Sequence, residues 1–313
     1  MSLDRLIVAI ERTKNPTVVG LDPKLAYVPE HLQQEAFRAH GGETLEAAAA
    51  ALLAFNKGII DAIADIVPAI KPQAAYYEMY GWAGMRALEE TIAYAHTKGL
   101  FVITDAKRGD IGATMEAYTA AHLGTVQVGN TTHVPFGGDA LTVNGYLGLD
   151  SIQPLLETCR ERDTGVFVLA KTSNISSSDL QDLTLTDNGN TWTVYRQMAE
   201  LIAFWGRTLM GRRGYSGIGA VVGATYPTQL AELREALPHT FFLVPGYGAQ
   251  GGSAADVVPA FDAQGGGAVV NNSRGIICAW QRSGGDGHDY AEAAREATIK
   301  MRDMLRQEIP GLS

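Results

Sequence analysis

The stretch GLFVITDAKRGD (residues 99–110) joins an apolar run directly to a cluster of charges. The run LFVI is short and rich in apolar and β-branched residues, as is typical of a strand buried on both faces of a parallel sheet. Asp105, Lys107 and Asp110 follow it at once. Such charges often lie on an exposed helix start, so the role of this cluster depends on the fold that surrounds it.

Similar apolar runs recur along the chain. They are TVVGLDP (17–23), IVPAIKP (66–72), ALTVNGY (140–146), GVFVLAKTS (165–173), GIGAVVGAT (217–225), TFFLVPGYG (240–248) and GAVVNNSRG (267–275). Segments with helical periodicity lie between them, including residues 47–66, 81–99, 193–210 and 227–237. Together with residues 100–107, these runs make eight strands that alternate with helices, which predicts a (β/α)8 TIM barrel. A doubly wound sheet is the alternative, but it seldom needs eight such units without a second domain.

No linker rich in Pro or Ser divides the chain, so residues 1–313 are expected to form a single barrel domain. Two connections are longer than the others. Residues 24–46 form a polar, helix-prone insertion after the first strand, and residues 174–192 form a polar insertion after the fifth. Both follow carboxyl ends of strands, where barrel loops carry function. The Gly-rich segment 250–267 is a third candidate, for a mobile lid.

The composition excludes several classes of partner. The net charge of -9 argues against a general nucleic-acid surface or an anionic-membrane surface, although it permits a small basic pocket. The longest apolar run, residues 47–55, is too short to cross a bilayer. Residues 1–14 are expected to form an amphipathic helix rather than a signal peptide. Since only Cys159 and Cys278 are present, we expect a reducing compartment, the cytoplasm.

In a TIM barrel, side chains that follow the strands meet at one end of the molecule. Asp105 and Lys107 are two residues apart, so on an extended strand they face the same side, and Lys71 lies one strand over. We therefore expect an alternating chain of charges, Lys71–Asp105–Lys107–Asp110. A purely structural ion-pair lattice is less favoured, because lysines in a barrel mouth are costly unless they are paired or used.

The chemistry of such a chain follows from its charges. Neighbouring carboxylates favour the protonated form of each lysine. A protonated lysine is a poor nucleophile for a Schiff base but a good proton donor to a carbanion. The cluster therefore favours acid chemistry over imine chemistry.

The loops after the last two strands favour an anionic ligand. Barrels commonly bind phosphate there, and Gln250 offers an amide donor while Arg274 offers a bidentate charge. Residues 246–251 also match GxGxxG, but Asn271 and Asn272 stand where a dinucleotide site needs an acidic residue, so we reject that interpretation. The histidines show no HxH or HExxH spacing, and no metal site is predicted.

The pattern Asp105-x-Lys107-x-x-Asp110-Ile111-x-x-Thr114 resembles the signature of the orotidine 5'-monophosphate (OMP) decarboxylase family, in its longer bacterial subclass. The resemblance extends over essentially the whole chain. Its other motifs are VVGLDP with Asp22, AIKPQAAYYE with Lys71, VLAKTSN with Ser173, VPGYGAQGG with Gln250 and NNSRGI with Arg274.

This resemblance implies conversion of OMP to UMP and carbon dioxide, the last step of de novo UMP biosynthesis, without a metal or organic cofactor. Lys107 would protonate C6, Asp105 would face the departing carboxylate, and Lys71 and Asp110 would complete the network. The implied substrate contacts are Asp22 with Lys71 on the ribose hydroxyls, Ser173 on the pyrimidine, and Gln250, Arg274 and the backbone at Gly251 on the phosphate. A homodimer is also implied, in which Asp110 and Thr114 reach the neighbour's site.

Two alternatives remain. Sister barrels with the same Asp-x-Lys-x-x-Asp motif, 3-keto-gulonate-phosphate decarboxylase and hexulose-phosphate synthase, depend on magnesium and carry a carboxylate where this chain has Lys71. A non-catalytic nucleotide-binding barrel would keep Gln250 and Arg274 but would not need the chain of charges. Lys171 replaces an acidic residue of some relatives, and we assign it no role from the sequence.

Overall fold

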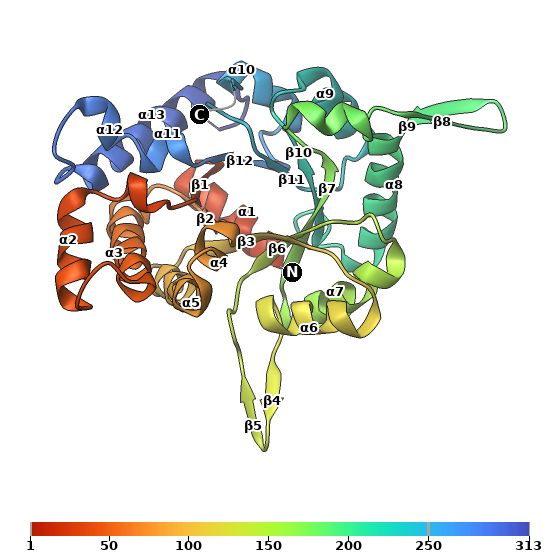
Figure 1. Ribbon diagram of the computed structural model, residues 1–313. Helices are drawn as coiled ribbons and strands as arrows, with labels where there is room; N and C mark the ends of the chain where they lie inside the picture. Colours follow the sequence, from red (N-terminus) through yellow and green to blue (C-terminus); the bar gives the residue numbers. More distant parts are fainter. Residues whose placement is uncertain (1, 249–250, 313) are drawn as a thin grey trace.

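The computed structural model describes residues 2–248 and 251–312, and its centre is a closed barrel of parallel strands (Figure 1). In order around the barrel the strands are β1 (Thr17–Leu21), β2 (Ala69–Pro72), β3 (Phe101–Arg108), β6 (Ala140–Val143), β7 (Gly165–Lys171), β10 (Ile218–Val222), β11 (Phe242–Val244) and β12 (Ala268–Asn272), which pairs with β1. Each lies in one of the predicted apolar runs, except that β3 continues one residue past its run, to Arg108. The predicted (β/α)8 TIM barrel is confirmed.

Helices surround the barrel on its outside (Figure 1). The longer ones are α3 (Leu45–Ile63), α5 (Gly81–Thr97), α6 (Gly112–His122), α7 (Leu149–Arg162), α8 (Val194–Gly206), α9 (Pro227–Ala236) and α13 (Tyr290–Glu308). Short helices α4 (Ala75–Glu78), α11 (Arg274–Ile277) and α12 (Trp280–Ser283) follow strands β2 and β12. Because the strands are buried on both faces, one core lies inside the barrel and a second lies between strands and helices.

The N-terminal helix α1 (Ser2–Thr13) packs against the inner core. Its buried residues Leu3, Leu6 and Ile10 join the cluster that contains Phe101 and Phe167 from the strands. These positions are spaced at three and four residues, which places them on one face of the helix. The predicted amphipathic helix is confirmed. None of the helices within the described residues is long and apolar enough to cross a membrane.

The two predicted insertions are present. Residues 24–46 contain the 3₁₀ turn η1 (Leu25–Tyr27) and helix α2 (Glu30–Ala39), which packs on α3. Residues 174–192 contain η2 (Ile175–Asp179) and the hairpin of β8 (Thr184–Asp187) and β9 (Asn190–Thr193). A second hairpin, β4 (Val126–Val128) with β5 (Thr131–His133), was not predicted and projects away from the barrel (Figure 1).

Part of the Gly-rich segment 250–267 is helical. Helix α10 (Ala254–Val257) begins with a capping box between Ser253 and Asp256, and the 3₁₀ turn η4 (Val258–Ala260) follows it. Residue 250 lies outside the described residues. That this segment moves as a lid stays a prediction.

The end of α6 carries a buried histidine that should make stability depend on pH. His122 is 2% exposed and stacks on Phe136, with ring centroids 5.1 Å apart. Burial, and secondarily the charge of Arg108, lowers the pKa of His122 to about 4. The unfolded chain therefore binds this proton first as the pH falls. The contribution of neutral His122 to the free energy of unfolding is fully present above about pH 6.5. It falls by roughly 3 kcal/mol as the pH is lowered from there to about pH 4.

We expect His122→Phe, which keeps an aromatic ring in the stack, to reduce the fall in the free energy of unfolding between about pH 6.5 and pH 4. The measurement is the free energy of unfolding by urea at several pH values from 7 to 4. Other groups titrate equally in both proteins, so the difference between the two curves isolates His122. Parallel curves would contradict the assignment.

Candidate active site

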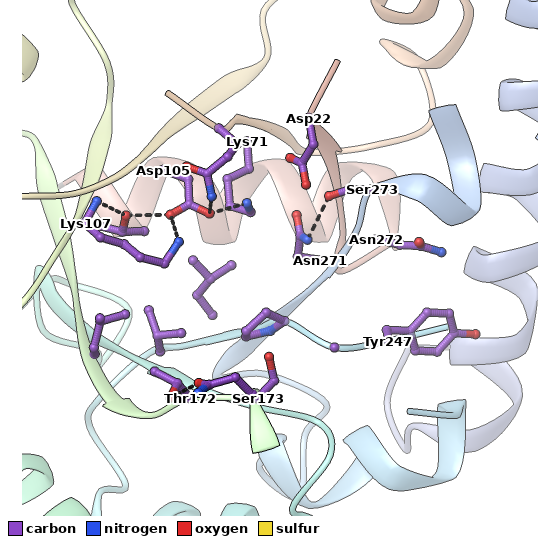
Figure 2. A pocket seen from close by; sticks show the side chains of 18 of the residues that line it. Asp22, Lys71, Asp105, Lys107, Thr172, Ser173, Tyr247, Asn271, Asn272 and Ser273 are labelled. Atoms are coloured by element: carbon purple, nitrogen blue, oxygen red, sulfur yellow. Dashed lines mark hydrogen bonds and ion pairs between the residues drawn. The ribbon is translucent and has the colours of Figure 1, made fainter. Parts of the chain in front are cut away.

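A cavity of about 520 Å³ lies at the carboxyl ends of the barrel strands (Figure 2). Its polar lining comes from β1, β2, β3, β6, β7 and β12 and from the residues that follow them: Asp22, Lys71, Gln73, Asp105, Lys107, Thr142, Thr172, Ser173, Asn174, Gln181, Asn271, Asn272, Ser273 and Arg274. Apolar side chains, including Leu169, Val221 and Leu243, complete the wall. The cavity therefore brings together Asp22, Lys71, Asp105, Lys107, Ser173 and Arg274 of the predicted site residues.

Asp105 is the centre of a dense hydrogen-bond network. Its Oδ2 accepts from Lys71 Nζ and, at 3.1 Å, from Gln73 Nε2. Its Oδ1 accepts from Lys107 Nζ at 2.7 Å and from Thr142 Oγ1 at 2.8 Å. The side chain of Asp105 is 8% exposed, so these donors replace the water around its carboxylate. Gln73 and Thr142 were not among the predicted site residues.

The two lysines differ in their access to solvent. The side chain of Lys71 is 5% exposed, whereas that of Lys107 is 45% exposed. Burial alone would lower the pKa of Lys71, but the charges of Asp105 and Asp22 outweigh it and raise the pKa. Burial alone would likewise raise the pKa of Asp105, but Lys71 and Lys107 hold it well below its usual range. Asp105 and Lys71 are therefore both charged at neutral pH.

Lys107 has an unusual backbone. Its φ is +48°, and the register between β3 and β6 shifts between Thr104 and Arg108. Its N–H donates to Thr142 Oγ1 at 3.0 Å, which fixes this turn. The left-handed conformation costs a non-glycine residue about 1 to 2 kcal/mol and is enriched at functional positions. The expectation of a regular extended strand is therefore wrong here, although Lys107 still reaches Asp105.

Asp110 does not join this network within one chain. Its Oδ1 accepts from the N–H of Ile111 at 2.8 Å, and it is not part of the cavity lining. Thr114 is exposed on the first turn of α6. The predicted chain of four charges thus ends at Lys107 in a single chain. Strand β3 ends at Arg108, two residues before Asp110.

The other side of the cavity carries the remaining predicted contacts. Ser173 follows β7, and Arg274 begins α11 just after β12. Gly251 is exposed, with a φ of +101° that favours glycine, and Gln250 lies outside the described residues. Asp22 Oδ1 and Asn271 Oδ1 are buried without a hydrogen-bond partner among the described residues. Buried polar atoms without partners at a cavity are positioned for a ligand.

Nothing in the described part of the chain gathers three or more His, Cys, Asp or Glu residues for a metal ion. At the end of β2, where a metal-binding barrel of this type would need a carboxylate, the ammonium group of Lys71 contacts Asp105 instead. A divalent cation there would be repelled by this charge.

The sequence and the fold match known proteins over nearly their full lengths. The model of the orotidine 5'-phosphate decarboxylase / HUMPS family matches residues 34–282. An orotidine 5'-phosphate decarboxylase of Rhodopirellula baltica is 47% identical over 306 residues, covering 96% of this chain and 98% of that protein. One of Clostridium perfringens is 39% identical over 99% of both chains. The structure of Leishmania donovani OMP decarboxylase aligns with a TM-score of 0.71 at 32% identity, covering 97% of this chain and 98% of that one. The chain therefore belongs to the orotidine 5'-phosphate decarboxylase / HUMPS family.

Proposed function

We propose that this protein decarboxylates OMP to UMP and carbon dioxide. The observation that carries the proposal is Asp105 held between Lys71 and Lys107 at the cavity wall. This arrangement keeps a negative charge where the substrate carboxylate must leave and an ammonium group beside the carbon that it leaves. The curated relatives described above carry the name of this activity.

In the proposed mechanism, the bond between C6 and the carboxylate breaks and its electron pair stays on C6. Lys107 Nζ then gives a proton to C6, and solvent returns a proton to the lysine through the cavity mouth. Repulsion between two carboxylates 4 Å apart supplies roughly 4 kcal/mol at an effective dielectric near 20. That corresponds to about a thousandfold in rate, far less than slow reactions of this kind require. Stabilisation of the developing charge at C6 by Lys107 is therefore the larger effect.

Other predicted site residues are proposed to bind the ribose, the pyrimidine and the phosphate of the substrate. Asp22 and Lys71 hold the ribose hydroxyls, which would satisfy the unpartnered Asp22 Oδ1. Ser173 contacts the pyrimidine. Arg274, Gln250 and the backbone at Gly251 hold the phosphate, and no metal or organic cofactor takes part.

We further propose a homodimer in which Asp110 and Thr114 complete the site of the partner. Both residues lie close in sequence to Lys107 yet point to no group in their own cavity. The neighbouring Ile111 is 55% exposed, as an interface residue of an isolated chain would be. We also place the reaction in the cytoplasm, in keeping with the unpaired Cys159 and Cys278.

A magnesium-dependent reaction on a sugar phosphate is the second candidate, and the position of Lys71 argues against it. Purified protein in excess EDTA is expected to remove the absorbance of OMP rapidly. Activity on a sugar phosphate that requires added Mg²⁺, with none on OMP, would move the chain to the sister branch. Binding of UMP without any turnover of OMP would make it a non-catalytic barrel.

A further inference from the structure

A buried lysine outside the catalytic network ties the insertion after β7 to the barrel. Lys171 has no exposed surface, and its Nζ donates to Asp182 Oδ1 at 2.7 Å and to Ser177 Oγ at 2.9 Å. The ammonium group also lies 4.3 Å from the centre of the Tyr226 ring. Both hydrogen-bond acceptors belong to the insertion. A buried lysine without partners is strongly destabilising. The two hydrogen bonds from Lys171 to Ser177 and Asp182 therefore hold residues 177–182 in place.

Between these two anchors the insertion places Gln181 at the cavity wall. Its backbone N–H donates to the carbonyl of Ser177 at 2.8 Å. Its Oε1 accepts from the N–H of Thr172 at 2.9 Å, and its Nε2 donates to Thr172 Oγ1 at 2.7 Å. A carboxamide carries two N–H donors, and Thr172 takes one of them. The other donor remains for a ligand beside Ser173.

The position of this wall indicates which part of the substrate meets it. Figure 2 shows Thr172 and Ser173 across the cavity from Lys71 and Asp105. Apolar residues, among them Val221, lie within the same cavity and suit a flat ring. A ring whose reacting carbon faces Lys107 must therefore turn its far edge toward Thr172 and Ser173. On a pyrimidine that edge carries carbonyl and N–H groups.

We propose that Gln181 recognises the pyrimidine ring together with Ser173, and that the Lys171–Asp182 pair positions Gln181 for this contact. Lys171 is thus a positioning residue and Gln181 a specificity-determining one. The inference rests on the proposed function for the identity of the ring. It gives the insertion 174–192 a role in selecting the base.

The test compares a ligand that has the base with one that lacks it. Dissociation constants of UMP and of ribose 5-phosphate are measured by calorimetry for wild type, Gln181→Ala, Gln181→Glu and Asp182→Asn. The glutamate variant keeps an acceptor for the Thr172 N–H but loses both amide donors. We expect each variant to bind UMP about tenfold more weakly, because one hydrogen bond is lost, and to bind ribose 5-phosphate within about twofold of wild type. The KM for OMP should rise in parallel.

Asp187→Asn is the matched control, because Asp187 is an exposed carboxylate of the same insertion, in β8, and contacts Asn188 rather than Lys171. It should leave both constants unchanged. Unchanged UMP binding by the Gln181 variants, or an equal loss for both ligands in any variant, overturns the inference. A wild-type protein that neither binds UMP nor turns over OMP refutes the proposed function instead, so the two failures are distinct.

Discussion

Replacing Lys107 with alanine is expected to lower kcat for OMP by roughly ten-thousandfold, the largest effect of any single change in the site. The side chain supplies both the proton and the positive charge nearest to C6, and neither function has a substitute nearby. Lys71 cannot replace it, because its ammonium group is buried against the other oxygen of Asp105. The measurement is kcat at saturating OMP by loss of absorbance.

The fold should survive this substitution. Asp105 keeps its hydrogen bonds from Lys71, Gln73 and Thr142, so its charge stays compensated. Lys24→Ala serves as the matched control, because Lys24 is exposed at the same end of the barrel but does not line the cavity. It should change kcat by less than about twofold. Activity of Lys107→Ala within tenfold of wild type would mean that the proton comes from another group.

The barrel could be predicted from the sequence because each of its strands is buried on both faces. Such strands are continuous apolar runs, and the side chains after them must converge at one end. The two hairpins lack this signal. Strands β4, β5 and β8 are exposed along their whole length, so pairing alone defines them and no hydrophobic pattern marks them.

The site was predicted less completely because its details depend on contacts between distant residues. The left-handed backbone of Lys107 is fixed by Thr142, which is 35 residues away, and nothing near Lys107 indicates it. Asp110 is close to Lys107 in sequence. Closeness in sequence does not determine whether a side chain lies in the cavity of its own chain or points away from it. The role of Lys171 could not be predicted without knowing that Asp182 is its partner. Asp182 is one of several acidic residues in the insertion, and the sequence does not distinguish it from the others.

Replacing Asp105 with alanine is expected to lower kcat by about a thousandfold, because the repulsion of the substrate carboxylate is lost, and to lower the free energy of unfolding by about 3 to 5 kcal/mol. The reason is that Lys71 would remain buried with its main partner removed.

The pH dependence of the free energy of unfolding determines the pH at which this loss should be measured. The pKa of Asp105 is lowered by folding, so its contribution is fully present above about pH 4 and is lost as the pH falls. The pKa of Lys71 is raised, so its contribution is fully present below about pH 10.5 and is lost as the pH rises further. Urea unfolding at pH 7 therefore reports the whole effect.

The double variant Lys71→Met with Asp105→Leu separates the stability of the site from its chemistry. It removes both buried charges and fills their space with apolar side chains, which is often neutral or stabilising. We expect it to unfold at a urea concentration near that of wild type while remaining inactive. That result would show that the fold does not need the charged pair and that catalysis does. If Asp105→Ala were as stable as wild type, Lys71 would have to find another partner or solvent. If the double variant were as unstable as the single one, the charged pair would itself stabilise the barrel.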